Sequence, residues 1–373
     1  GAAPGQGGAA QSRRAADEGV APEVITTRYT EAYHQDLDAL HCLRPDIEPR
    51  VNALLRQMTL AEKIGQLTQY SGHWNATGPV TFKGSHREEL LAGRVGSMLN
   101  VLGAEHTRAY QAMAMQSRLK IPLLFGQDVI HGYQTTVPIP LAEAASWDLP
   151  AIEQSARIAA TEAAAAGIHW TFAPMVDIAR DPRWGRVMEG AGEDVHLGSK
   201  IAFARVKGFQ GRRLGDTDAV MATAKHFAAY GAAQGGRDYN SVDMSERMLR
   251  ETYLPPFKAA VDAGVATFMN AFNDLNGIPA TGSRLLQRDI LKGEWRFPGF
   301  VVSDWGSIGE MVAHGHAKDL RHAAQLAISA GSDMDMESKA YRDHLGELVH
   351  QGPVKLALVD DAVRRVLRKK FEL

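Results

Sequence analysis

The sequence has little cysteine, no long apolar run and almost no net charge, and each absence narrows what the protein can be. Cys42 is the only cysteine in 373 residues, so neither an intrachain disulfide nor a multi-cysteine metal site can form. No apolar run approaches the roughly 18 residues that cross a membrane. Lysine and arginine number 41 against 43 acidic residues, and no basic stripe stands out. This balance argues against nucleic acid as a partner and fits a neutral substrate.

Several common catalytic and cofactor signatures are also missing. No Gly-x-Gly-x-x-Gly follows an early strand, and neither a Walker sequence nor a Gly-x-Ser-x-Gly elbow occurs. His314 and His316 have no third ligand at a matching spacing. The segment from Asp333 to Glu337 begins like a calcium loop but lacks the required glycine and the terminal glutamate. The sequence therefore implies no cofactor and no metal.

What the sequence does have is a regular alternation between short apolar runs and longer segments of helical period. The apolar runs, interpreted as strands, cover residues 95–100, 122–128, 169–177, 219–226, 266–273, 300–304 and 332–336. The helical segments cover residues 105–119, 151–167, 194–210, 245–263, 284–294 and 320–330. Such alternation predicts an α/β fold with a parallel sheet and right-handed crossovers. Seven β/α units are clear, and an eighth strand is hidden or absent.

The chain divides into an arm and one large domain. Residues 1–46 are predicted to be a flexible N-terminal arm and lead-in, of which residues 1–22 are small, polar and without the apolar core of a signal peptide. Residues 47–373 form the predicted catalytic domain. With 45% apolar residues, the chain can build a core of the required size.

Helix ends carry their own signals. Residues 59–62 and 243–246 resemble capping boxes, in which the first side chain accepts from a backbone N–H and the glutamate reaches back. Gly167, Gly264 and Gly331 stand where three of the predicted helices should end.

The polar residues at the strand ends favour a closed (β/α)8-like barrel, with one strand irregular or missing, over an open doubly wound sheet. All C-terminal strand ends of a barrel open on one face, where active sites lie. The residues expected to converge there are Asp128, Asp177, Lys225 with His226, Asn273, Asp304, and Asp333 with Asp335.

Asp304 and Trp305 follow a buried-looking strand and suit a carbohydrate site. A carboxylate can serve as nucleophile or general base, and an indole packs against the C–H face of a sugar. The alternative is that Asp304 only caps the helix expected over residues 307–312.

Cationic and acidic side chains at other strand ends suit hydroxyl binding. Lys225 and His226 end one strand and can donate to several hydroxyls, although Lys225 also permits a Schiff-base lyase as a remote alternative. Asp128 ends another strand, and its carboxylate can accept hydrogen bonds from vicinal hydroxyls or cap a turn. In the arginine-rich loop at 177–186, Arg183 or Arg186 can bind a hydroxyl or form a structural ion pair.

Six ordered segments together resemble the N-terminal barrel of glycoside hydrolase family 3, near the bacterial periplasmic β-glucosidases. They are residues 126–132 (GQDVIHG), 172–177 (FAPMVD), 181–186 (DPRWGR), 189–194 (EGAGED), 225–231 (KHFAAYG) and 302–306 (VSDWG). The likeness spans roughly residues 47 to 371, and six matches in order are far more specific than any single one.

The resemblance implies a retaining exo-acting β-glycoside hydrolase, with β-glucosidase as the best match, and a periplasmic or extracellular location. It assigns Asp304 as the nucleophile that forms a covalent glycosyl–enzyme. Residues that match those holding the nonreducing sugar are Asp128, Arg186, Lys225 and His226. Trp305 matches an aromatic side chain near the +1 position.

The sequence departs from the family pattern in two ways. Phe272 stands where family members often have a tyrosine whose hydroxyl faces the nucleophile. The family's α/β sandwich domain, which carries a glutamate as general acid/base, does not follow the barrel, and residues 227–245 lack the histidine that another branch uses instead. We therefore expect a further domain or second chain to supply the acid. The alternatives are an unorthodox acid from a loop and a sugar-binding barrel with little or no catalysis.

Overall fold

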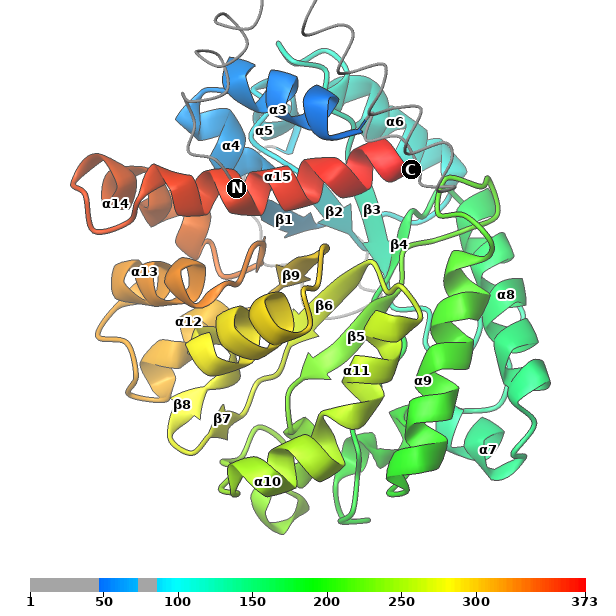
Figure 1. Cartoon of the computed structure of the whole chain (residues 1–373). Coiled ribbons are helices and arrows are strands. Elements are labelled where there is room, and N and C mark those ends of the chain that lie inside the picture. Colours follow the sequence, from blue (N-terminus) through cyan, green and yellow to red (C-terminus); the bar gives the residue numbers. More distant parts are fainter. Residues whose placement is uncertain (1–46, 73–85) are drawn as a thin grey trace, which may run out of the picture. The chain divides into compact units, whose positions relative to one another are not determined.

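Eight short parallel strands form the centre of the part of the chain that the computed structural model describes, residues 47–72 and 86–373 (Figure 1). They are β1 (Thr68–Ser71), β2 (Ser97–Leu99), β3 (Leu124–Gln127), β4 (Trp170–Thr171), β5 (Thr223–Phe227), β6 (Thr267–Asn270), β9 (Phe300–Val302) and β10 (Asp335–Met336). The predicted arm and lead-in lie outside the described residues, and their boundary at residue 46 stays a prediction.

The strands follow one another in a ring. Parallel ladders give the order β10-β1-β2-β3-β4 in one sheet and β5-β6-β9 in another. Single parallel bridges join the two sheets, from Trp170 to Met221 beside β5 and from Val302 to Met334 beside β10. The predicted (β/α)8-like barrel is therefore confirmed, and its irregularities are these two junctions and a register shift in β5 between Ala224 and Phe227.

The eighth strand is β1, which the sequence pattern did not reveal. Its four residues, Thr68–Ser71, are all buried although three of them are polar. Apolar runs identify a strand only when its side chains are apolar, and three of the four side chains of β1 are polar.

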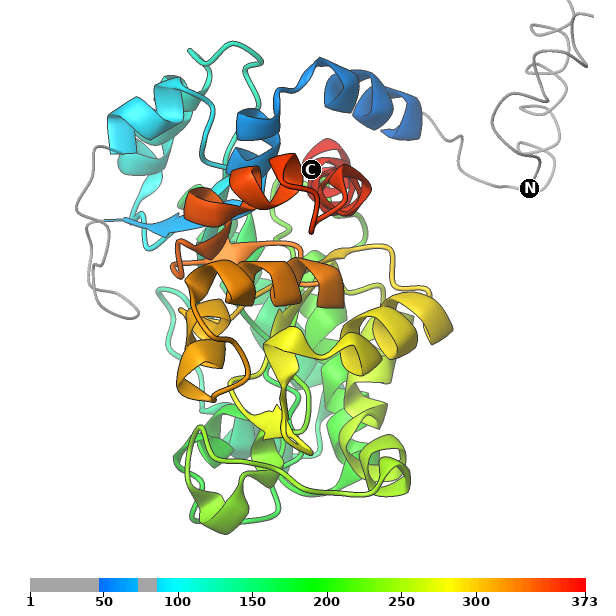
Figure 2. The same ribbon diagram turned by 90° about the vertical axis from the view of Figure 1, so that its left-hand side faces the viewer.

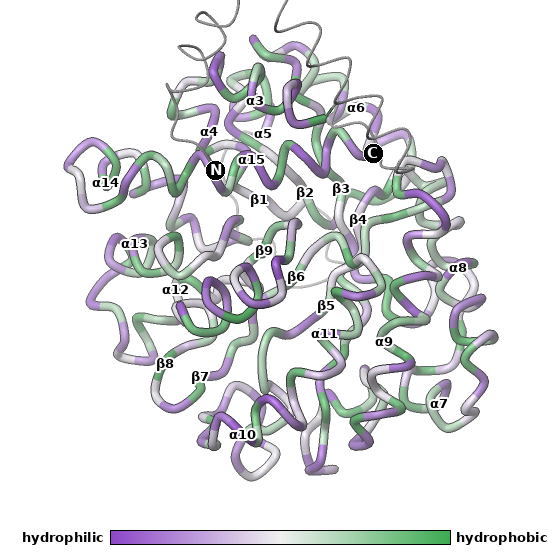
Figure 3. The backbone as a smooth tube through the Cα atoms, in the orientation of Figure 1, coloured by the Kyte–Doolittle hydropathy of each residue, from purple (hydrophilic) through white to green (hydrophobic). Residues whose placement is uncertain are grey.

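Helices surround the strands (Figure 1), and hydrophilic and hydrophobic residues alternate along them (Figure 3). Their buried residues are mostly apolar. Their bounds are α3 (Ile47–Gln57), α4 (Leu60–Gln66), α5 (His86–Leu91), α6 (Ala104–Ala114), α7 (Pro140–Ala145), α8 (Leu149–Ala165), α9 (Val195–Gln210), α10 (Glu246–Met248), α11 (Pro255–Asp262), α12 (Ser307–Ala313), α13 (Leu320–Ala330), α14 (Gly346–His350) and α15 (Leu356–Glu372). The helix predicted over 245–263 is α10 and α11 joined by a π-helical turn, and that over 284–294 is π-helical from Leu285 to Glu294.

The helix-end signals were mostly right. Thr59 and Glu62 form the predicted capping box at α4. The capping box predicted at Asp243 is wrong, because α10 is capped by Ser245, whose hydroxyl accepts from the Met248 N–H. Gly167, Gly264 and Gly331 end α8, α11 and α13 with φ of 86°, 86° and 113°, which glycine adopts without strain.

The barrel is filled at its middle and closed at the N-terminal ends of its strands. Trp170 is fully buried, and its indole N–H donates to the hydroxyls of Thr223 (2.7 Å) and Thr267 (2.9 Å) from β5 and β6. Lys370 of α15, the red helix beside α4 in Figure 2, donates to the backbone carbonyls of Gly96 and Pro122 that precede β2 and β3. The N-terminal strand ends of β2 and β3 are thus covered by α15.

A buried ion pair joins the helical segment before β9 to the start of β10. The Lys292 ammonium lies 2.7 Å from both carboxylate oxygens of Asp333, and both side chains are almost completely buried. Asp333 Oδ2 also accepts from the Val301 N–H of β9 (2.8 Å). Asp333 therefore fixes the junction between β9 and β10.

Replacing Lys292 by methionine should cost about 3–5 kcal/mol of unfolding free energy, because it leaves the Asp333 carboxylate buried without its cation. Urea denaturation followed by circular dichroism measures this loss. The matched control is Lys258→Met, which removes an exposed pair with Asp262 on α11 and should cost at most about 0.5 kcal/mol. Equal losses in the two variants would contradict the structural role of Asp333.

Candidate active site

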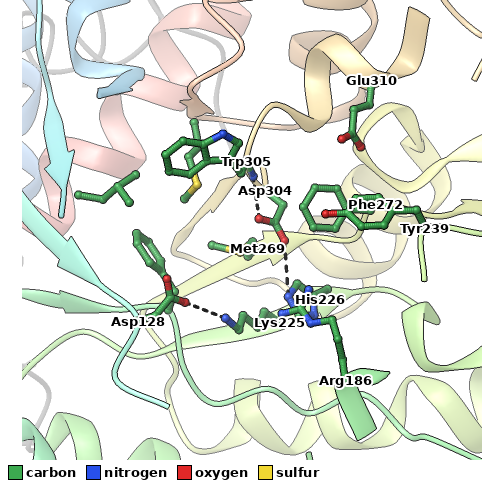
Figure 4. A pocket seen from close by; sticks show the side chains of 13 residues that line it. Asp128, Arg186, Lys225, His226, Tyr239, Met269, Phe272, Asp304, Trp305 and Glu310 are labelled. Carbon is green, nitrogen blue, oxygen red and sulfur yellow. Dashed lines mark hydrogen bonds and ion pairs between the residues drawn. The ribbon is translucent and has the colours of Figure 1, made fainter. Parts of the chain in front are cut away.

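The six side chains singled out from the sequence line one cavity of about 320 Å³ at the C-terminal strand ends (Figure 4). They are Asp128, Arg186, Lys225, His226, Asp304 and Trp305. They come from the ends of β3, β5 and β9 and from the loop that follows β4. The barrel thus brings together residues that lie up to 177 positions apart in the chain.

Asp304 stands two residues after β9 and is 9% exposed. Its Oδ1 accepts from the Trp305 N–H at 2.7 Å, and its Oδ2 lies 3.5 Å from His226 Nε2. The helix-cap alternative is wrong, because α12 has Gly306 at its N-cap and no side chain caps it. The carboxylate is therefore free to act in the cavity.

The ionisation of Asp304 reflects two opposing effects. Burial raises the pKa of its carboxyl, and the charges of Lys225 and Arg186 lower it, with a net value of about 6. At neutral pH the carboxyl is therefore mostly ionised, as a nucleophile must be.

An irregular strand lets two adjacent residues share the cavity. Side chains of neighbouring residues in a regular strand point to opposite faces. The pairing of β5 with β6 shifts register between Ala224 and Phe227, so Lys225 and His226 both line the cavity. Lys225 donates a hydrogen bond to Asp128 at 2.9 Å. This pair presents an ammonium and a carboxylate side by side to the hydroxyl groups of a sugar. It does not present the free amine that a Schiff base requires.

His226 is neutral and is oriented by a carboxylate behind it. Burial, together with the charges of Arg186 and Lys225, lowers its pKa well below the usual value. Its Nδ1 lies 2.9 Å from Asp177 Oδ2, which also accepts the His226 backbone N–H at 2.8 Å. With its proton on Nδ1, the ring presents Nε2 to the cavity, where it has no hydrogen-bond partner within the described residues. A hydroxyl group can donate to that nitrogen.

Arg183 and Arg186, the two candidates for hydroxyl binding in the arginine-rich loop, have different surroundings. Arg186 lines the cavity and forms a bidentate pair with Glu189 at 2.6 and 3.0 Å. Burial lowers the pKa of Arg186, but Glu189 more than offsets this, so it stays charged. Arg183 pairs with Asp181 on the surface and is 72% exposed, which matches the structural alternative for that residue.

Several strand-end residues expected at the site lie elsewhere. Asp333 is paired with Lys292, and Asp335 accepts from the Tyr341 and Ser338 N–H groups, so both have structural roles. Asn273 donates to backbone carbonyls and does not line the cavity. The expectation that these three residues line the site is wrong, because their side chains are hydrogen-bonded or ion-paired to other parts of the protein.

Seven residues that line the cavity were not among the site residues predicted from the sequence: Leu99, Phe172, Tyr239, Met269, Phe272, Glu310 and Met336. Phe272, noted only as a departure from the family, lines the cavity, and the ring of Tyr239 lies 4.4 Å from it. Tyr239 stands in a loop with no recognisable pattern. Glu310 lies on α12, half-buried, and burial followed by the charge of Asp304 raises its pKa to about 7.

The cavity thus offers an ionised carboxylate, hydroxyl-binding cations and anions, and aromatic surfaces. Across residues 47–72 and 86–373, no three His, Cys, Asp or Glu side chains gather as a metal site would require. In the same ranges, no helix has the length and apolarity to cross a bilayer.

Known proteins resemble this chain closely in sequence and fold. Residues 59–369 match the family model described as the glycosyl hydrolase family 3 N terminal domain. A periplasmic beta-glucosidase of Salmonella typhimurium is 44% identical over 344 residues, which are 92% of this chain and 44% of that protein. A putative beta-xylosidase of Formosa agariphila is 34% identical over 88% of this chain and 46% of its own length.

Solved structures agree with these relatives. The beta-glucosidase of Listeria innocua in complex with isofagomine superposes with a TM-score of 0.83 at 43% identity, covering 87% of this chain and 46% of that one. The chain therefore spans less than half the length of each of these three proteins.

Removing the Lys225 charge should raise the pKa of Asp304 above 6, because the cation favours the ionised carboxyl and its loss leaves Asp128 as an unpaired anion nearby. Carbon-13 NMR of aspartate carboxyls, with the Asp304 signal assigned by Asp304→Asn, measures the midpoint in Lys225→Met. The exposed-lysine variant Lys258→Met should leave it unchanged. A midpoint that stays or falls in Lys225→Met would contradict this electrostatic picture.

Proposed function

We propose that this chain, which belongs to glycoside hydrolase family 3, is the nucleophile-bearing barrel of a retaining, exo-acting β-glucosidase. In this proposal Asp304 attacks the anomeric carbon of a nonreducing β-glucosyl residue and forms a covalent glycosyl ester. The observation that carries it is a buried strand-end carboxylate in a cavity that is also lined by two anchored cations, Asp128, His226 and an indole.

The cavity's charged side chains are suited to bind the sugar's hydroxyl groups rather than to neutralise the Asp304 carboxylate. Lys225 is anchored by Asp128 and Arg186 by Glu189, so each cation keeps its place while retaining donors for hydroxyl groups. Together with Asp128 and His226 they supply donors and acceptors on one side of Asp304 (Figure 4). A single sugar ring fits a cavity of about 320 Å³, which supports exo action.

Trp305 supports a leaving-group position beside the nucleophile. It directly follows Asp304, lines the cavity and is partly exposed, so its indole is open to a ring stacked upon it. We propose that it contacts the +1 sugar or aglycone.

The proposal also covers the longer protein, its general acid/base residue and its location. Relatives named as β-glucosidases are about twice as long as the matched region, which supports a further domain that contributes the general acid/base glutamate. The likeness to a protein named periplasmic supports export from the bacterial cytoplasm.

A 2-deoxy-2-fluoro-β-glucoside with an activated leaving group should label Asp304, because the fluorine slows hydrolysis of the glycosyl ester more than its formation. Mass spectrometry of the digested chain should find one fluoroglucosyl group on the peptide that contains Asp304. Asp304→Asn should lose the label and slow turnover by roughly a thousandfold, about 4 kcal/mol of barrier. A chain that binds glucose but is never labelled would be a sugar-binding barrel instead.

Arg183, in the same loop as Arg186, serves as the control for testing whether Arg186 binds the sugar. Arg186→Ala should lower kcat/KM for an aryl β-glucoside by about 10–100-fold, because a hydrogen bond from a charged group contributes about 1.5–3 kcal/mol. Arg183→Ala removes an exposed ion pair and should change it less than about threefold. Steady-state kinetics on both variants measures the difference, and similar losses would refute the assignment of Arg186.

A further inference from the structure

Asp177 is a buried carboxyl that contacts the cavity residue His226 from behind. It follows β4 in a segment that runs beside β5, where Met175 bridges to Lys225. His226 lines the cavity and Asp177 does not, and both side chains are almost completely buried. Within the described residues Asp177 Oδ1 has no hydrogen-bond partner, so the contacts of this carboxyl with His226 are those of Oδ2.

One carboxylate oxygen faces two nitrogens of the same residue. Asp177 Oδ2 accepts from the His226 backbone N–H at 2.8 Å and lies 2.9 Å from His226 Nδ1. The backbone nitrogen always carries its hydrogen, so an acceptor must stand at this position. An ionised carboxylate accepts and does not donate, and the proton of the neutral imidazole therefore lies on Nδ1. The ring of Tyr230, at 75° to the imidazole with 5.1 Å between centroids, packs against it and holds its plane.

The position of the imidazole proton decides what the nucleophile faces. His226 Nε2 lies 3.5 Å from Asp304 Oδ2 and has no hydrogen-bond partner within the described part of the chain. With the proton on Nδ1, Nε2 presents a lone pair to the cavity. With the proton on Nε2, the ring would donate toward Asp304, and a hydrogen bond to the charged form would make that carboxylate less basic.

We propose that Asp177 is a positioning residue that keeps the His226 proton on Nδ1, away from the nucleophile, so that the cavity selects sugars with a hydroxyl group that donates to Nε2. The inference rests on the proposed function, because it names a requirement that this site places on its sugar. A hydroxyl group meets the requirement because it both donates and accepts. A C–H group offers no comparable donor, and a C–F group can only accept.

Nitrogen-15 NMR of the 373-residue chain labelled in histidine reads the tautomer directly. Burial raises the pKa of Asp177, against the His226 N–H and the charge of Arg186, to about 7, so at pH 8 the carboxyl is ionised. The His226 signals, assigned by their loss in His226→Gln, should show a protonated Nδ1 and an unprotonated Nε2.

Two variants of Asp177 serve as controls for each other, since both remove the charge and only one keeps the acceptor. Asp177→Asn should preserve the proton on Nδ1, because the His226 backbone N–H requires the amide oxygen, and not the NH2 group, at the Oδ2 position. Asp177→Leu offers no acceptor and should move the proton to Nε2, where Asp304 can accept it.

Calorimetric titration with phenyl 1-thio-β-glucoside and its monodeoxy and monodeoxyfluoro analogues measures the hydroxyl requirement without any turnover. At one ring position both analogues should bind the parent and Asp177→Asn about tenfold more weakly than the full glucoside, because Nε2 is left without its donor. In His226→Ala and Asp177→Leu the loss at that position should shrink to less than about threefold.

Several outcomes would overturn the proposal. They are a proton on Nε2 in the parent or in Asp177→Asn, an unchanged tautomer in Asp177→Leu, and a fluoro analogue that binds as tightly as the glucoside at every position. If Asp177→Leu does not fold, the parent, Asp177→Asn and His226→Ala still decide. Failure of the fluoroglucosyl label to reach Asp304 would instead remove the proposed function, because neither the NMR nor the titration depends on catalysis.

Discussion

The site depends on keeping a buried carboxylate charged. Burial opposes ionisation of Asp304, and the charges of Lys225 and Arg186 favour it, so the net pKa of about 6 lies just below neutrality. Each cation is in turn anchored by an acidic partner, Asp128 or Glu189, and neither forms a direct ion pair with Asp304. Asp304 is thus kept ionised by neighbours that do not neutralise its carboxylate by direct contact.

A ring of parallel strands is what makes this balance possible. The partners of Asp304 come from β3, β5 and the loop after β4, and they meet only because every strand ends on the same face. At the opposite face Lys370 of α15 binds the carbonyls before β2 and β3. The register shift in β5 adds the one local departure that the chemistry requires, since it turns two consecutive side chains toward one cavity.

The sequence predicted the fold and the polar side of the cavity because both leave local patterns. Alternating apolar runs and helical segments identify β/α units, and ordered motifs identified the six residues that converge on the cavity. The polar strand β1 and the structural use of Asp333 could not be predicted, since both depend on which atoms meet across the barrel. Tyr239 and Glu310 were missed for the same reason, because a loop residue or an exposed-looking helical glutamate gives no signal until the chain is folded.

The absence of a tyrosine at position 272 has a chemical consequence of its own. A hydroxyl donating to the nucleophile would stabilise its charge and make it less basic. With Phe272 there, the backbone N–H of Trp305 is the hydrogen-bond donor to Asp304 within the described residues, and burial keeps the pKa above the usual value. A carboxylate with few donors retains more electron density for attack. The substitution that departs from the family therefore leaves Asp304 the more basic carboxylate, with the Trp305 N–H as its donor.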